Sequence, residues 1–140
     1  MSRRRSLSKG ELLPLPVAKV RALSLENHLA FAVVNAGKGS HEQVGRLLRV
    51  MYLAYYLRNE TAPGADTALY RQAEQALDHC IERSVPNNIW TLMPDEREIL
   101  RELLIVHDEQ LTVVSAHRYL SAWERMQTFL VTGSGRSIIS

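Results

Sequence analysis

Covalent cross-links and membrane-spanning segments are what this sequence most clearly lacks. Cys80 is the only cysteine among 140 residues, so no disulfide can form within the chain. No run of 18 apolar residues occurs, and we therefore expect no transmembrane helix. The N-terminus is basic, but no long apolar segment follows it, which argues against a secretory signal peptide. Together these absences predict a cytoplasmic protein with no membrane partner.

The sequence also lacks the motifs that bind metals and those that assemble a catalytic nucleophile. None of the five histidines has an acidic residue three positions before it, and no HExxH sequence occurs. We interpret His107, on an apolar helix face, as a hydrogen-bonded core residue. Cys80 lies on an inner helix face and is interpreted as a small buried hydrophobe. We expect no catalytic residue, no metal, no cofactor and no enzymatic activity.

Residues 37–40, GKGS, invite comparison with a phosphate-binding loop. That motif requires GxxxxGK followed by Ser or Thr, after a buried strand. Here Gly39 follows Lys38, and the preceding segment has a helical pattern. Ser40 and Gln43 fit a capping box at the start of a helix instead. We therefore predict a turn between two helices at this position.

Apolar residues recur at helical spacing through most of the chain, and no segment shows the period of two that is typical of strands. An apolar content of 46% is typical of a globular protein rather than a disordered one. The predicted fold is all-α, a bundle of four or five helices with a long C-terminal helix. The helices are expected at residues 17–36 (with a more secure start at 24), 41–59, 66–83 and 94–131.

The segment 94–131 contains no glycine or proline after its first residue, Pro94, and is about twice as long as the other expected helices. As one unbroken helix it would extend roughly 50 Å, beyond the roughly 30 Å width of a small domain. The consecutive β-branched residues Thr112, Val113 and Val114 have weaker helix propensity. We therefore predict a bend or a break near residues 112–116.

The half of this segment that follows the break carries large apolar side chains. It is expected either to fold back onto the bundle or to supply a dimer surface, because such side chains are costly to expose. A homodimer is the preferred expectation. The residues predicted to mediate self-association are Trp123, Met126 and Phe129.

Positive charge is concentrated at the N-terminus. Residues 1–21 carry a net charge of +5, whereas the remainder carries −3. We predict a basic flexible leader at 1–16, a single helical domain at 17–132 and a flexible tail at 133–140. The leader either contacts nucleic acid or stays solvated. Its candidate nucleic-acid contacts are Arg3, Arg4, Arg5 and Lys9.

Basic and aromatic residues alternate along the helix expected at 41–59. Arg46, Arg49, Tyr52 and Tyr56 recur at spacings of three and four, which places them on neighbouring turns of one face. Tyrosine and arginine are favoured at protein interfaces, and the same pairing also holds phosphates and stacks bases. A third interpretation leaves the arginines in solvent and packs the tyrosines with their polar tips exposed. We predict that these four residues bind a protein partner.

Residues 24–57, SLENHLAFAVVNAGKGSHEQVGRLLRVMYLAYYL, resemble segments of small uncharacterised helical accessory proteins of bacterial plasmids and phages. The resemblance covers about a quarter of the chain and includes no catalytic or binding motif. It implies an accessory role on a mobile element, such as regulating transcription or binding a host complex. It transfers no functional residue to this sequence.

These observations predict a non-enzymatic helical interaction or regulatory protein that binds a host protein complex. The alternative is a nucleic-acid-binding transcriptional regulator that uses the basic N-terminal arm and the Arg46/Arg49 face. A helix-turn-helix is not favoured, because the helix after the GKGS turn is too apolar to read a DNA groove. Salt-dependent binding to duplex DNA distinguishes the two.

Overall fold

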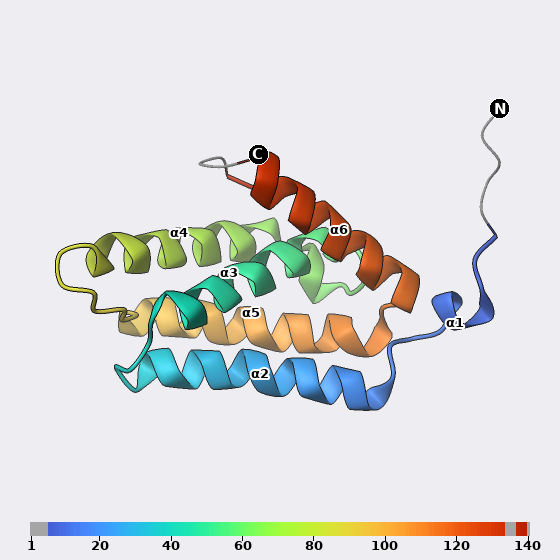
Figure 1. The fold of residues 1–140 in the computed structure, drawn as a ribbon, viewed down its shortest axis with the longest axis horizontal. Coiled ribbons are helices and arrows are strands. Elements are labelled where there is room, and N and C mark those ends of the chain that lie inside the picture. Colours follow the sequence, from blue (N-terminus) through green and yellow to red (C-terminus); the bar gives the residue numbers. More distant parts are fainter. Residues whose placement is uncertain (1–5, 134–136, 140) are drawn as a thin grey trace.

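The structure, a computed structural model, is all-helical, as predicted, and describes residues 6–133 and 137–139 (Figure 1). Within these ranges there is no strand, only two isolated bridge pairs. No helix in the described ranges is long and apolar enough to cross a membrane. The elements are α1 (Lys9–Leu12), α2 (Val17–Asn35), α3 (His41–Tyr56), the 3₁₀ turn η1 (Pro63–Ala65), α4 (Thr67–Ser84), α5 (Pro94–Val113) and α6 (Ala116–Thr132).

Helix α3 is the centre of the fold. It contacts α2, α4, α5 and α6, while α2 and α4 also pack against α5 (Figure 1). The apolar stripe of α3 is buried as its spacing predicts, with Leu47 and Met51 at 0% exposure. Leu77 of α4 and Leu103 of α5 are equally buried against it. Four helices therefore cover α3 on most of its circumference.

The local signals around the GKGS turn have the expected roles. Ser40 and Gln43 form a capping box at the start of α3, and Gly37 adopts a positive φ of 76° after α2. The end of α3 is different, because the helix stops at Tyr56 rather than near residue 59. The backbone N–H of Arg58 donates to Tyr55 O and leaves the carbonyl of Ala54 for a side chain of α5.

The segment 94–131 breaks where its sequence predicts. Val114 and Ser115 are extended, and Ser115 caps α6 by accepting a hydrogen bond from the backbone N–H of Arg118. Leu15 N donates to Val114 O at 3.4 Å, and Ala116 N donates to Leu13 O at 2.9 Å. The break is thus held in place by the chain that precedes α2. As a result α6 folds back across α3 instead of protruding (Figure 1).

The N-terminal segment is more structured than the predicted flexible leader. Residues 9–12 form the short helix α1, and Ser8 caps it through a capping box with Glu11. Leu15 is 7% exposed and joins the apolar cluster between α3, α5 and α6. The predicted leader thus includes a capped helical turn and, at Leu15, a residue packed on the body of the protein. Arg3, Arg4 and Arg5 lie outside the described residues.

The C-terminal segment also differs from the predicted flexible tail. Ile138 and Ile139 are buried at 7% and 8% exposure in the main core. The Glu74 carboxylate accepts hydrogen bonds from Ser137 Oγ at 2.6 Å and from Ile138 N at 3.1 Å. The two consecutive isoleucines at 138 and 139 are the feature of the sequence that could have indicated burial. No pattern in the sequence indicated which surface they cover.

We expect Leu15→Ala to lower the free energy of unfolding by about 2 kcal/mol. The substitution removes a buried side chain that fixes residues 13–15 beside the break between α5 and α6. Leu12→Ala is the matched control, since Leu12 is 62% exposed, and it is expected to change stability by less than about 0.5 kcal/mol. Urea unfolding followed by circular dichroism measures both. Equal effects of the two variants would contradict the anchoring role of Leu15.

Candidate functional site

The predicted Arg/Tyr face of α3 is divided into two parts by the packing around it. Arg46 turns toward α2, where its Nε donates to Asn27 Oδ1 at 3.0 Å and its Nη2 to Glu26 Oε2 at 2.5 Å. Arg49 is exposed, and within the described part of the chain it makes no ion pair. In the arginine half of the face, Arg46 is therefore held against α2 and only Arg49 remains open.

The tyrosine half lies beneath α6. The ring of Tyr52 meets that of Phe129 edge-on at 5.4 Å between centroids, and the Arg125 guanidinium lies 4.6 Å from the centroid of Tyr56. Burial is the main cause that raises the pKa of both tyrosines above the ordinary value. Both side chains are half-buried. This arrangement matches the interpretation in which the tyrosines pack and only their tips stay exposed.

The residues predicted to mediate self-association face their own chain. Met126 is 0% exposed in the cluster beneath α6. Trp123 and Phe129 are half-buried, and Phe129 packs on Tyr52. Of the two alternatives expected for this segment, folding back and meeting a second chain, the structure shows the first, because α6 lies across α3. For Met126 the expectation of a surface contact is wrong.

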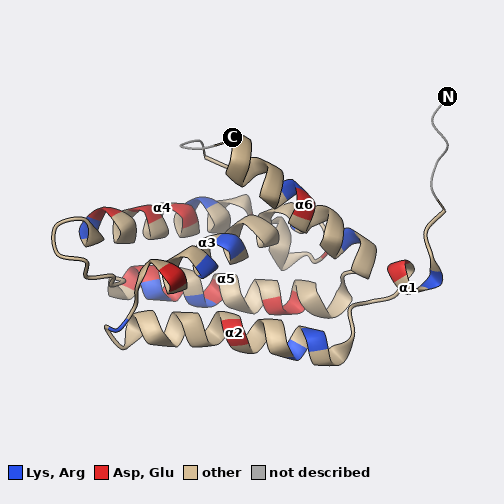
Figure 2. Cartoon of the chain, viewed as in Figure 1, with Lys and Arg blue, Asp and Glu red and all other residues tan. Residues whose placement is uncertain are grey.

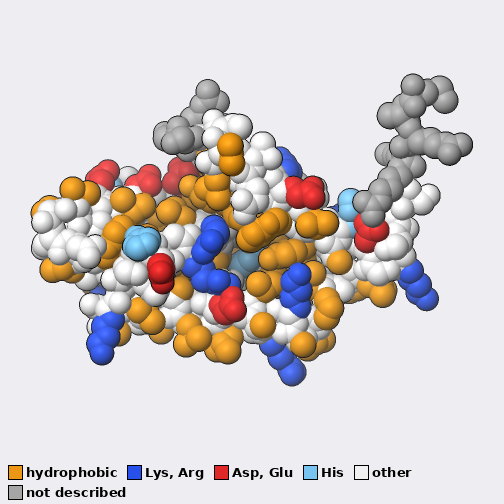
Figure 3. All heavy atoms as spheres, in the orientation of Figure 1, with side chains coloured by type: hydrophobic (Ala, Val, Ile, Leu, Met, Phe, Trp, Pro, Cys, Tyr) orange, Lys and Arg blue, Asp and Glu red, His pale blue; other side chains and the backbone are white. Residues whose placement is uncertain are grey.

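A cavity of about 650 Å³ opens beside the arginine half of α3. It is bounded by the chain before α2, by α2, α3, α6 and by one residue of α5. Figure 3 shows this face, where Lys and Arg side chains lie beside hydrophobic side chains between α2 and α6. Its apolar walls come from Leu15, Leu23, Val50, Leu53, Leu120 and Trp123, and its cations are Lys19, Arg46 and Arg49.

His107 is the residue that α5 contributes to this cavity, and it is 2% exposed. Its Nδ1 lies 3.0 Å from Gln110 Oε1. The Gln110 amide nitrogen donates to the carbonyls of Ala54 and Leu57, so its oxygen must accept, and His107 Nδ1 carries the proton. Burial lowers the pKa of His107, and the imidazole is neutral at pH 7. The prediction of a hydrogen-bonded core histidine is confirmed, with Nε2 left as an acceptor.

The chemistry available elsewhere is limited. Cys80 is 0% exposed, as predicted, and burial raises the pKa of its thiol, which disfavours the nucleophilic thiolate. In the described ranges, no group of three His, Cys, Asp or Glu side chains is arranged to hold a metal ion.

An exposed apolar stripe on α2 was missed in the sequence. Leu25 and Leu29 are 60% and 54% exposed, and exposed alanines extend the row in both directions. The α2 helix carries few charges, most of them near its N-terminal end (Figure 2). In the sequence, the stripe is recognisable because its residues are separated by alternating steps of four and three. It was missed because the opposite face of α2 is also apolar. The stripe consists of Ala18, Ala22, Leu25, Leu29, Ala32 and Ala36.

No protein-family model, curated protein or solved structure matches the chain.

Proposed function

We propose that this protein is a non-enzymatic interaction protein that docks through the α2 stripe (Ala18, Ala22, Leu25, Leu29, Ala32 and Ala36). The observation that supports this is the stripe itself, an uncovered apolar row at heptad spacing. Apolar residues at alternating steps of three and four form the seam of a coiled coil. A partner helix is therefore the natural occupant.

The first occupant that we propose is a second copy of this chain. The stripe is symmetric about position 27, with Ala18 matching Ala36, Ala22 matching Ala32 and Leu25 matching Leu29. Two antiparallel copies of α2 would then place leucines against leucines at the centre and alanines against alanines at both ends. A two-fold axis requires this kind of self-complementary surface.

The arginine half of α3 lies beside the stripe rather than on it, since Arg46 and Arg49 line a hollow together with Leu29. Arg49, which has no ion pair within the described ranges, is then the leading contact for a further protein partner of the kind that the resemblance to mobile-element accessory proteins suggests. Tyr52 and Tyr56 would contribute only their exposed tips. A host protein complex is the partner class that we propose for this surface.

The test compares the wild type with a variant that carries both Leu25→Glu and Leu29→Glu. Burying two carboxylates at the centre of the seam is expected to weaken self-association about 100-fold. Sedimentation velocity over a range of concentrations measures the dissociation constant. Ile105→Glu is the control, because Ile105 is a comparably exposed apolar residue (51%) on a different helix.

The wild type and the control are expected to dimerise equally, and all three proteins should keep the same circular dichroism spectrum. A wild type that stays monomeric at high concentration would overturn the proposal. So would a double variant that dimerises as tightly as the wild type. Tight, salt-sensitive binding to duplex DNA by the monomeric variant would favour the nucleic-acid regulator instead.

A further inference from the structure

The cavity between α2, α3, α5 and α6 has the size and the lining of a small-molecule site. Its volume of about 650 Å³ falls within the range of roughly 300 to 1,000 Å³ for ligand pockets. Leu53 and Trp123 belong to its apolar wall and come from helices that pack tightly against each other. Apolar walls that include an aromatic side chain favour an apolar ring over a polar body.

His107 requires a hydrogen-bond donor from whatever fills the cavity. Its Nδ1–H is engaged by Gln110, whose amide is oriented by two backbone carbonyls of the α3 terminus. Nε2 therefore presents a lone pair, and no residue in the described ranges donates to it. His107 Nε2 is not among the buried polar atoms without a partner, so it is accessible from the cavity. A ligand that fills the cavity would bury this acceptor, and a ligand hydroxyl or N–H would prevent the cost of leaving it without a donor.

The residues that line the cavity carry a net positive charge. Lys19, Arg46 and Arg49 are opposed by Glu26 alone among its lining residues, which gives a net charge of +2 with His107 neutral. Glu26 and Asn27 already engage Arg46. Lys19, which lies 5.3 Å from the Tyr119 ring centroid, and Arg49 have no carboxylate partner in the described ranges. These two side chains remain available to a ligand anion.

We propose that this cavity binds a small aromatic carboxylic acid that also carries a ring N–H or hydroxyl group. The ring lies against Leu53 and Trp123, the donor group faces His107 Nε2, and the carboxylate meets Arg49 and Lys19. The cavity shares no lining residue with the stripe of α2. It lies next to the stripe, because Glu26 and Arg49 also line a hollow with Leu29, and it shares Arg49 with the surface proposed for a protein partner.

Three probe molecules separate the contributions of the two polar ends. Indole-3-acetate has both the N–H and the carboxylate, 1-naphthaleneacetate lacks the N–H, and 3-methylindole lacks the carboxylate. Isothermal titration calorimetry on the full chain is expected to show the tightest binding for indole-3-acetate. Loss of either group is expected to weaken binding at least about tenfold, because a buried acceptor or an unpaired cation is then left without a partner.

Two variants assign these effects to residues. Arg49→Gln is expected to weaken both acids about tenfold and to leave 3-methylindole unchanged. Arg71→Gln, which alters an exposed arginine of α4 outside the cavity, is expected to change nothing. His107→Leu is expected to abolish the preference for indole-3-acetate over 1-naphthaleneacetate.

The proposal does not depend on whether His107→Leu folds, because the probe series and Arg49→Gln test it in native packing. Absence of binding by indole-3-acetate at about 10 mM would overturn it. Equal affinity for all three probes would also overturn it, since that result describes an apolar cavity without polar recognition. A failure here leaves the dimer test unaffected, and the reverse also holds.

Discussion

Gln110→Leu is expected to lower the free energy of unfolding by about 3 kcal/mol. Gln110 is 0% exposed, and its side chain donates to Ala54 O at 2.9 Å and to Leu57 O at 3.2 Å. Its oxygen accepts the hydrogen bond from His107 Nδ1 at 3.0 Å. Leucine has a similar size but makes none of these bonds. The variant therefore strands buried polar groups without leaving a large cavity.

The expected loss of stability depends on which buried groups lose their only hydrogen-bond partner when Gln110 is replaced. Leu57 O keeps the bond from Glu60 N. Tyr70 OH, which also accepts from the Gln110 amide at 3.4 Å, keeps its own bond to Gly64 O. Ala54 O and His107 Nδ1 have no such replacement within the described ranges. Each buried group left unsatisfied costs about 1 to 3 kcal/mol. For a chain of this length the loss corresponds to a fall in Tm of about 10 °C.

A double variant distinguishes unsatisfied polar groups from changes in packing. Gln110→Leu combined with His107→Leu removes both members of one hydrogen bond, and such paired removal is often nearly neutral. The double variant is therefore expected to be more stable than Gln110→Leu alone, by about 1 kcal/mol. Urea unfolding at pH 7 measures both. A single variant that loses less than about 1 kcal/mol would show that the carbonyls of α3 find water instead.

The role of Gln110 shows why part of the fold was predictable and part was not. Capping by Ser40 and Gln43 and the break near Val114 depend on residues close together in sequence, and both predictions are confirmed. The end of α3 depends on Gln110, which is 56 residues from Ala54 in the sequence. No local pattern reports such a contact, and the predicted helix is therefore three residues too long.

Prediction of the candidate site from the sequence was limited in the same way. The spacing of Arg46, Arg49, Tyr52 and Tyr56 correctly places them along α3, but it says nothing about α6 lying over the tyrosines. The cavity needs residues from five segments that meet only in the folded chain. The α2 stripe is the exception. Its spacing was present in the sequence and was missed because the inner face of α2 is equally apolar.

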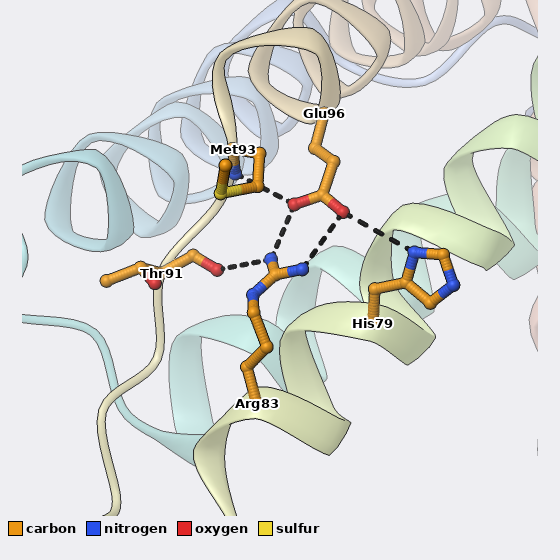
Figure 4. A network of polar contacts seen from close by, with 5 residues as sticks. All are labelled: His79, Arg83, Thr91, Met93 and Glu96. Atoms are coloured by element: carbon orange, nitrogen blue, oxygen red, sulfur yellow. Dashed lines mark hydrogen bonds and ion pairs between the residues drawn. The ribbon is translucent and has the colours of Figure 1, made fainter.

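Glu96→Ala is expected to lower the free energy of unfolding by about 3 kcal/mol. Glu96 is 6% exposed at the start of α5, and Figure 4 shows its carboxylate between Arg83, His79 and the backbone before α5. Oε1 accepts from Arg83 Nη2 at 2.5 Å and from Met93 N at 2.8 Å. Oε2 accepts from Arg83 Nη1 at 3.3 Å. One carboxylate thus closes the turn from α4 into α5.

Removing this carboxylate leaves a positive charge poorly solvated. The Arg83 side chain is 35% exposed, and its Nε is buried without a hydrogen-bond partner among the described residues. Its remaining contact would be Thr91 O, at 2.9 Å from Nη2. Breaking one side of a buried ion pair typically costs about 3 to 5 kcal/mol, and the partial exposure of Arg83 places this case at the lower end.

Glu98→Ala provides the matched control on the same helix. Glu98 also pairs with an arginine, Arg101, but both side chains are more than half exposed. Its loss is expected to cost less than about 0.5 kcal/mol. Chemical unfolding monitored by circular dichroism measures both variants. Similar losses for Glu96→Ala and Glu98→Ala would contradict the claim that burial sets the difference.

A second variant tests whether the charge or the packing matters. Glu96→Gln with Arg83→Met removes both charges, keeps a side-chain oxygen that can accept from Met93 N, and fills the space of the arginine stem. Replacing a buried ion pair with groups of similar volume is often neutral. We therefore expect this double variant to recover at least half of the stability that Glu96→Ala loses. If it unfolds as readily as Glu96→Ala, the bidentate geometry itself holds the turn between α4 and α5.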